Sequence, residues 1–223
     1  MTFSLAARCP ATGQFGIAIT TSSIAVGNRC PWARAGVGTI QTQHRTDIRL
    51  GPIGLDLLAR GMSAGETVKA LVAMSEFPDQ RQLGAVDRNG NTAFYCGPKI
   101  PSLNSGAQGR GCVAVGNVIA NLGVPQAMVD AFEASQGNPF AERLLAAADA
   151  GLAAGGETKP IMSAALLIVD REAWPLVDLR VDYEERPLTA LRRLWNAYAP
   201  QVEHFVIQVL RPDEVRPPAP AAP

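Results

Sequence analysis

Strand hairpins that stand next to pairs of helices constrain the fold of this chain more than any other feature. Two short apolar segments, 2–7 and 15–22, flank a Cys-Pro-Ala-Thr-Gly turn and predict an antiparallel hairpin. A second hairpin is predicted over 82–96, because Asn89-Gly90 is the dipeptide most typical of a tight turn between strands. Strict alternation of strand and helix is absent. The order therefore predicts an α+β protein with largely antiparallel sheets, and it disfavours a doubly wound parallel sheet.

Hydrophobic periodicity and turn residues predict the other elements. Ser63 and Glu66 match a capping box and place a helix over 63–74, after a first helix over 51–61. Residues 97–116 are rich in Gly, Ser, Pro and Asn, so an extended loop that ends in a short strand at 112–115 is predicted there. We expect further strands over 35–43, 163–170 and 176–183, and further helices over 125–133, 141–154 and 187–198.

The length of 223 residues suits one domain, which we expect to span 1–211. Residues 212–223 are rich in Pro and Ala and predict a disordered tail. Lys and Arg total 20 and Asp and Glu total 20, so the formal net charge of zero provides no basic field for nucleic acid or an anionic membrane. We expect neither of these partners.

The chain carries no signal for a membrane, a secretory route, a metal or a cofactor. No run of about 20 apolar residues is present, and Arg8 interrupts the short apolar start, so we expect a cytoplasmic protein without a membrane span. No dinucleotide fingerprint, phosphate-binding loop or HExxH motif occurs, which predicts chemistry without cofactor or metal. The four cysteines show no CxxC pairing and are expected to be reduced thiols: Cys9, Cys30, Cys96 and Cys112.

Thr2 is the residue most suggestive of catalysis. Methionine aminopeptidases remove Met1 when a small residue follows it, and Thr2 would then be the first residue. Its hydroxyl and its α-amine would belong to one residue, and an α-amine with a pKa of about 7.7–8.0 accepts protons near neutral pH. This is the arrangement of an N-terminal threonine nucleophile. The alternative is an ordinary residue, because small residues are common after the initiator methionine.

Linked motifs along the chain carry a resemblance to a known family. The opening segment reads TFSLAARCPATGQFGIAITTSSIAVGNRCPWARAGVGTIQTQ, and RQLGAVDRNGNTAFYCG, GRGCVAVGNVIA, AERLLAAADAGLAAGGE and SAALLIVD follow in order. Together they resemble the domain-of-unknown-function family 1028, which is grouped with the N-terminal-nucleophile (Ntn) hydrolases. The resemblance covers most of the chain, to about Asp182.

The resemblance implies the four-layer αββα sandwich of the Ntn-hydrolase type, with Thr2 as nucleophile at the start of the first strand. The chain also departs from the family pattern. Cys9 and Ser23 stand where Asp and Arg are expected, and Glu157-Thr158-Lys159-Pro160 replaces an Asp, a variable residue and Arg-Gly. Lys lacks the planar fork of Arg, so we expect a substrate different from that of a typical member.

Asn117 is the candidate for stabilising an oxyanion, because a fixed side-chain amide donates hydrogen bonds to developing negative charge. The alternative is a turn asparagine bonded to its own backbone. Ser22, at the end of the second expected strand, is a candidate partner of the amine or nucleophile, or a plain strand-end residue. Thr42 and Gln43 match the family's Thr-Gln motif and are expected to line a pocket, unless they are ordinary sheet surface.

Four further residues are candidates for substrate binding. His44 follows the Thr-Gln motif and is a candidate for positioning a substrate carbonyl, although a loop role is the alternative. Glu157 and Lys159 are expected either to bind a polar substrate or orient the Thr2 amine, or to form an exposed charged turn. For Ser163, strand capping competes with a role in the site.

These residues predict a small amidohydrolase that acts on C–N bonds of a small amide or lactam through an acyl-enzyme. The first alternative is a ring-opening or ring-closing cyclohydrolase, since the same architecture hosts such chemistry. The second is a catalytically silent binding or scaffolding protein on the same fold. We also expect a homodimer, because two-fold homo-oligomers are common and the last predicted helix has no obvious intrachain role.

Overall fold

The structure is a computed structural model and describes residues 2–215. Ten strands form two antiparallel sheets. The larger sheet has the order β10-β9-β2-β1-β8-β7 and the smaller sheet the order β3-β4-β5-β6. The larger sheet consists of β1 (Thr2–Arg8), β2 (Phe15–Thr21), β7 (Asn104–Gly109), β8 (Cys112–Asn117), β9 (Ser163–Val169) and β10 (Val177–Val181), and the smaller of β3 (Pro31–Arg34), β4 (Gly38–Gln43), β5 (Gln82–Asp87) and β6 (Thr92–Cys96).

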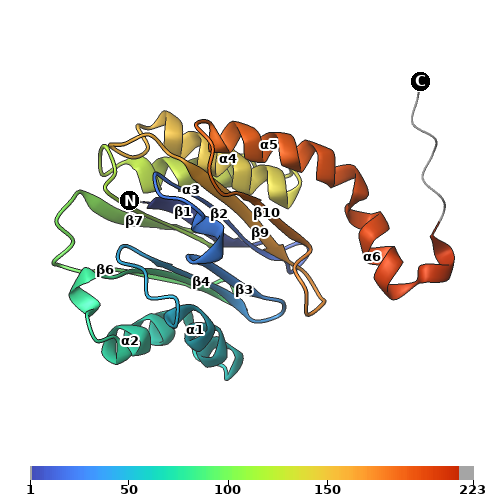
Figure 1. The fold of residues 1–223 in the computed structure, drawn as a ribbon. Helices are drawn as coiled ribbons and strands as arrows, with labels where there is room; N and C mark the ends of the chain where they lie inside the picture. Colours follow the sequence, from blue (N-terminus) through green and yellow to red (C-terminus); the bar gives the residue numbers. More distant parts are fainter. Residues whose placement is uncertain (1, 216–223) are drawn as a thin grey trace.

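The helices lie on the outer faces of the two sheets, as Figure 1 shows. Helices α1 (Leu50–Ala59) and α2 (Ala64–Met74) pack on the smaller sheet through a cluster that includes Ile40 and Leu83. Helices α3 (Val124–Ala134), α4 (Phe140–Ala153) and α5 (Pro187–Tyr198) cover the larger sheet. They pack on it through a second cluster, called the outer cluster below, which includes Met128 and Leu144. A third cluster, which includes Phe15 and Val86, lies between the sheets. The α+β class with antiparallel sheets is therefore confirmed.

β1 lies near the centre of the larger sheet, and its side chains alternate between two environments. Phe3 and Leu5 point toward the helices and belong to the outer cluster. Ser4 points toward the smaller sheet and donates a hydrogen bond to Gln43 Oε1 at 2.9 Å. Because successive residues of a strand face opposite sides, Thr2 lies on the inner face with Ser4.

The predicted hairpins, the capping box and most helices are confirmed. β1 pairs with β2, β5 pairs with β6 around Gly90 at φ 84°, and Ser63 and Glu66 form both bonds of the capping box. The run predicted at 163–170 is the strand β9, which ends at Val169, and every residue of the strand is buried.

Three predictions are corrected by the structure. Residues 104–109, predicted as part of an extended loop, form β7 and pair with β8, which contains the short strand predicted at 112–115. Gly106 is required in β7 because a Cβ there would lie 2.5 Å from the Phe94 ring. The strand expected over 35–43 begins at Gly38, and the edge strand β3 precedes it. A further helix, α6 (Val202–Leu210), was not predicted, because its many β-branched residues disfavour a helix on propensity.

The end of the chain differs in two respects from the expectation. Helix α5 has a clear intrachain role, since Leu188 and Leu191 are buried in the outer cluster. The predicted disordered tail begins at Pro212, yet Pro212–Glu214 form a short 3-10 turn, and residues 216–223 lie outside the described part. Among residues 2–215, no helix is both long and apolar enough to cross a membrane.

Candidate functional site

Three predicted site residues, Thr2, Asn117 and Ser163, meet at one end of the larger sheet. Thr2 begins β1, Asn117 ends β8 and Ser163 begins β9, and all three lie at the same end because neighbouring strands run antiparallel. Thr2 is directly paired with Asn117, and Ser163 with Thr21 at the end of β2. Directly paired residues project on one face of a sheet, so Thr2 and Asn117 share the inner face.

A hydrogen bond to the neighbouring strand β2 holds the hydroxyl of Thr2 at this end of the sheet. Thr2 is 5% exposed, and its Oγ1 donates a hydrogen bond to Thr21 Oγ1 at 3.3 Å. The next residue, Phe3, fixes the strand from the other side, because its ring packs against Gly151 of α4. A Cβ at Gly151 would come within 3.0 Å of that ring. The close approach of helix and strand therefore sets the position of Thr2.

A pocket of about 310 Å³ opens beside Thr2. Most of its lining is polar and comes from the loops that follow β2 and β4: Thr2, Thr21, Ser23, Val26, Arg29, Cys30, His44, Arg45 and Thr46. Burial raises the pKa of the Cys30 thiol, so this cysteine stays protonated and is a poor competing nucleophile. The composition of the lining suits a small polar molecule.

A chain of buried amides connects the two sheets behind Thr2. Gln41 Nε2 donates to Ser4 Oγ at 2.7 Å, and Ser4 Oγ donates to Gln43 Oε1. Gln43 Nε2 and Asn117 Nδ2 both donate to Gln82 Oε1, at 2.7 and 2.9 Å. All five residues are fully buried, so the network fixes the inner faces of β1, β4, β5 and β8 relative to one another.

The network also fixes the orientation of the Asn117 side chain. Gln82 Nε2 donates to the carbonyl of Gly116 at 2.8 Å, and a carbonyl only accepts, so Gln82 Oε1 must face Asn117. Asn117 Nδ2 therefore points toward Gln82, and one of its two hydrogens is used there. The Oδ1 atom of Asn117 is buried and has no hydrogen-bond partner among the described residues. Asn117 thus has an unused acceptor beside the start of β1.

Backbone strain is concentrated at the same end of the molecule. Among residues 2–215, the non-glycine residues with positive φ are Ala25 (55°), His44 (51°), Arg45 (47°) and Val118 (55°). Val118 follows Asn117, Ala25 precedes a pocket residue, and the other two line the pocket. Each such residue costs roughly 1–3 kcal/mol, and strain of this kind is typical of functional sites.

His44 has a defined tautomer. Its Nδ1 lies 2.7 Å from the carbonyl oxygen of Gln80, which can only accept, so Nδ1 carries the proton. Burial lowers the pKa of His44, which keeps the ring neutral at neutral pH. In this form Nε2 is an acceptor. His44 is therefore suited to accept an N–H, and not to donate to a carbonyl as the sequence-based hypothesis required.

Thr42 and Ser163 hold the loops of the pocket and do not line it. Thr42 Oγ1 donates to the carbonyl of Asp47 at 3.1 Å, across the loop that carries His44. Ser163 Oγ donates to the carbonyl of Ser23 at 2.7 Å and accepts from the N–H of Val26 at 3.1 Å. Both are fully buried, so the structure gives them positioning contacts.

Glu157 lies close to the end of β2. Its two carboxyl oxygens accept from the N–H of Ser22 at 3.1 and 3.2 Å, and Ser22 directly follows Thr21. Burial raises the pKa of Glu157 to about 7. Lys159 is exposed, and no ion pair joins it to Glu157 among the described contacts; both line a separate hollow of about 520 Å³.

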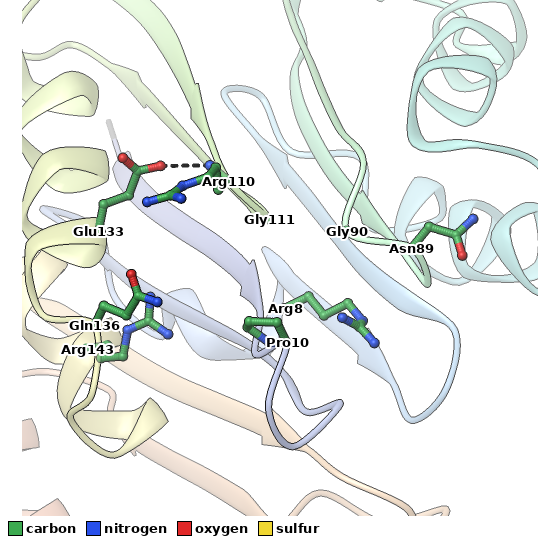
Figure 2. A pocket seen from close by; sticks show the side chains of 9 residues that line it. All are labelled: Arg8, Pro10, Asn89, Gly90, Arg110, Gly111, Glu133, Gln136 and Arg143. Atoms are coloured by element: carbon green, nitrogen blue, oxygen red, sulfur yellow. Dashed lines mark hydrogen bonds between the residues drawn. The ribbon is translucent and has the colours of Figure 1, made fainter.

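Another hollow, of about 320 Å³, lies at the opposite end of β1. Figure 2 shows Arg8, Arg110 and Arg143 around it, and Glu133 accepts a hydrogen bond from the backbone N–H of Arg110 at 2.7 Å. No residue predicted for the site lines this hollow. The left-handed turns beside it use glycine, at Gly90 and Gly111, and so carry no strain.

Several residues of the site were not found by sequence reasoning. Ser4, Gln41 and Gln82 belong to the amide network, and Arg29 and Arg45 line the pocket. Two of them have a signal in the strand pattern. Ser4 stands two residues after Thr2, and Gln41 stands two residues before Gln43. Because side chains alternate between the two faces of a strand, each lies on the same face as that predicted site residue. No group of three or more metal-binding side chains occurs within residues 2–215.

Comparison with known proteins establishes the family. A family model described as "Family of unknown function (DUF1028)" matches residues 2–191. The chain belongs to this family. A solved structure of the same family, protein SPO2555 from Silicibacter pomeroyi, is 31% identical, with a TM-score of 0.83 over 89% of this chain and 86% of that one.

Two other findings complete the comparison. The Anbu (ancestral beta-subunit) protein from Yersinia bercovieri is 13% identical, with a TM-score of 0.39 over 91% of this chain and 97% of that one. No curated protein matches the chain. Family membership therefore comes with no established reaction, and the function of this DUF1028 member has to be argued from its own residues.

Proposed function

We propose that this protein is a cofactor-independent amidohydrolase whose nucleophile is Thr2, exposed as an N-terminal residue by removal of Met1. The observation that carries the proposal is the place of Thr2: its hydroxyl lies at the start of a central strand and lines a polar pocket. The proposed fold type is the four-layer αββα sandwich of the Ntn hydrolases. The helices on the outer faces of the two packed sheets support it (Figure 1).

The proposed reaction proceeds through an ester. The Thr2 amine takes the hydroxyl proton as Oγ1 attacks the carbonyl carbon, which forms a C–O bond and a tetrahedral oxyanion. The oxyanion collapses, the C–N bond breaks, and the protonated amine gives its proton to the departing nitrogen. Water, deprotonated by the same amine, then attacks the ester, and the acid and the Thr2 hydroxyl are released.

Asn117 is the proposed partner of the Thr2 amine and of the substrate oxyanion. Its buried Oδ1, which has no partner among the described residues, would accept a hydrogen bond from the Thr2 amine and orient its lone pair. The second hydrogen of Nδ2 would stabilise the oxyanion. His44 Nε2 is an acceptor in the same pocket, and its proposed role is to hold an N–H of the substrate.

Hydrolysis of a panel of small amides and lactams by three proteins tests the proposal. The unsubstituted protein is expected to release acid from at least one of them. Thr2→Ser keeps a hydroxyl and an amine and is expected to retain activity, whereas Thr2→Ala loses it by about a thousandfold or more, as expected when a nucleophile is removed. Turnover that survives Thr2→Ala would overturn the nucleophile and favour cyclohydrolase chemistry elsewhere.

Circular dichroism and thermal melts of the three proteins are the matching control. β1 is held by backbone pairing with β2 and β8 on both sides, and the substitutions change only the side chain at its first residue, so neither should unfold the chain. A folded wild-type protein that binds small amides without hydrolysing any of them would contradict the proposal in favour of a silent binding protein.

A further inference from the structure

The pocket beside Thr2 has an uneven charge. Two arginines, Arg29 and Arg45, are among its lining residues, whereas no Asp or Glu is found among them. His44 adds no charge at neutral pH, because burial lowers its pKa. The carboxyl of Glu157, which contacts the end of β2, is bound to the N–H of Ser22 and lines a different hollow. The pocket therefore presents two permanent positive charges without a facing negative one.

Neither guanidinium is neutralised by the described part of the chain. Arg29 Nη2 donates to the carbonyl of Ile24 at 2.7 Å, and Arg29 Nε is buried without a partner among residues 2–215. Arg45 is exposed, and the ion pairs found within residues 2–215 include neither arginine. Their charge is thus available to a ligand.

Neighbouring arginines show a different pattern. Arg49 contacts Asp47 through Nε at 2.9 Å and Nη2 at 2.7 Å, and Arg34 pairs with Asp56 at 2.9 Å. Asp47 is the acid nearest to Arg45 in the sequence, and Arg49 already occupies both of its oxygens. The carboxylates of Asp47 and Asp56 are therefore paired with arginines that do not line the pocket.

The loop that holds Arg45 has a backbone conformation that non-glycine residues disfavour. His44 and Arg45 both have positive φ, at 51° and 47°, and Thr42 fastens the loop through the carbonyl of Asp47. Glycine would adopt this backbone without strain. An arginine held there at an energetic cost agrees with a role for its side chain at the pocket.

We infer that the acyl part of the substrate carries a carboxylate, bound by Arg29 and Arg45 while its amide carbonyl faces Thr2. Arginine binds carboxylates with charge-assisted and often bidentate hydrogen bonds. The pocket of about 310 Å³ holds both arginines and Thr2, so the acyl chain between carboxylate and amide is short. The substrate class is a monoamide of a small dicarboxylic acid, and this inference rests on the proposed function.

Three p-nitroanilides of matched chain length test the charge preference. Succinyl-p-nitroanilide ends in a carboxylate, butyryl-p-nitroanilide in a methyl group and γ-aminobutyryl-p-nitroanilide in an ammonium group. We expect kcat/KM for the succinyl compound to exceed that for the butyryl compound by about tenfold to a hundredfold, the range of hydrogen bonds to charged groups. The γ-aminobutyryl compound is expected to be the poorest substrate.

Variants of the two pocket arginines test whether they cause the preference for the succinyl compound. Arg45→Gln, at an exposed side chain, should reduce the succinyl preference by about tenfold through KM, and Arg29→Lys should reduce it less because the charge stays. Arg110→Gln is the matched control, since it removes an exposed arginine at the opposite end of β1 and should leave the preference unchanged (Figure 2).

The outcomes separate this inference from the proposed function. Hydrolysis that depends on Thr2 but favours the butyryl or γ-aminobutyryl compound overturns the carboxylate assignment and leaves the amidohydrolase standing. A succinyl preference that Arg45→Gln and Arg29→Lys leave intact also overturns it. A folded protein that hydrolyses none of the three and no other amide overturns both.

Discussion

The buried carboxyl of Glu157 ties the candidate site to pH. Glu157 is 8% exposed, and burial raises its pKa to about 7, although the hydrogen bonds from Ser22 favour the ionised form. In the unfolded chain the same carboxyl titrates near pH 4.3. The native state therefore holds a proton that the unfolded state releases between these two values.

The free energy of unfolding should fall as pH rises through this window. Below about pH 4 both states are protonated and the contribution is full, and it is lost as pH rises through the folded pKa of about 7. The total is on the order of 3 kcal/mol, because each tenfold difference in proton affinity between the two states corresponds to about 1.4 kcal/mol. Glu157→Gln should remove this slope, as measured by urea denaturation at a series of pH values.

Glu185→Gln is the control for that experiment, since it removes an exposed carboxyl from the same hollow. It should keep the wild-type slope. If Glu157→Gln and wild type lose stability in parallel between pH 4 and 7, the burial argument for Glu157 is wrong.

Arg45 offers a test of strain at a single residue. Arg45→Gly should stabilise the protein by roughly 1 kcal/mol, because relief of a positive φ exceeds the added chain entropy of glycine. It should also weaken binding of carboxylate-bearing substrates. Arg60, exposed and at φ −78°, is the matched site, and Arg60→Gly should destabilise. Thermal melts measure both changes in stability. A melting temperature of Arg45→Gly below that of the unsubstituted protein would contradict the predicted strain at Arg45.

Sequence reasoning located the strand ends of the site better than its contacts. Thr2, Asn117, Ser22 and Ser163 do meet at one end of the larger sheet. Gln82 stands at the start of a predicted strand, and no sequence pattern distinguishes it from an ordinary strand residue. Its role depends on contacts with Asn117 and Gly116 of the other sheet. A sequence pattern shows that faces alternate, and it does not show which two strands of different sheets face each other.

At the scale of the elements, the amide network is the main polar connection between the sheets. Gln82→Leu would remove the hydrogen bonds that Asn117 Nδ2 and the Gly116 carbonyl make to Gln82, whereas Gln43 Nε2 would keep its bond to the Val115 carbonyl at 3.3 Å. Buried groups left unsatisfied cost about 1–3 kcal/mol each, so we expect a loss of at least about 2 kcal/mol in the free energy of unfolding. Chemical denaturation measures it.

Gln108→Leu, in strand β7 of the larger sheet, provides the comparison. Gln108 is exposed and accepts one hydrogen bond from Thr92 at 2.7 Å, so its loss should change stability by less than about 0.5 kcal/mol. Equal effects of the two substitutions would show that the buried network contributes no more than a surface contact.

The predictions of secondary structure were wrong where tertiary contacts override the local preference of the sequence. Residues 104–109 look like a loop because they contain two glycines, an asparagine and a serine, yet Gly106 is needed beneath the Phe94 ring. Helix α6 contains mainly β-branched and polar residues and was not predicted. The hairpins were predicted correctly, since a tight turn and alternating burial are local properties.

At the scale of the whole molecule, α6 lies at the edge of the fold and extends from α5, as Figure 1 shows. None of its residues is buried, and Phe205, Val209 and Leu210 are exposed. If the expected homodimer forms through these apolar side chains, light scattering should give a dimer for the full chain and a monomer for a chain that ends after Gln201. A monomeric full chain would contradict the prediction of a homodimer.

Mass spectrometry of protein treated with a β-lactone tests whether Thr2, freed of Met1, is a nucleophile. Peptide mapping is needed, because Cys96 is partly exposed, although burial raises the pKa of its thiol. We expect a chain without Met1 that carries a single adduct on Thr2, and no adduct in Thr2→Ala. Retention of Met1, or labelling at Cys96 with Thr2 untouched, would contradict it.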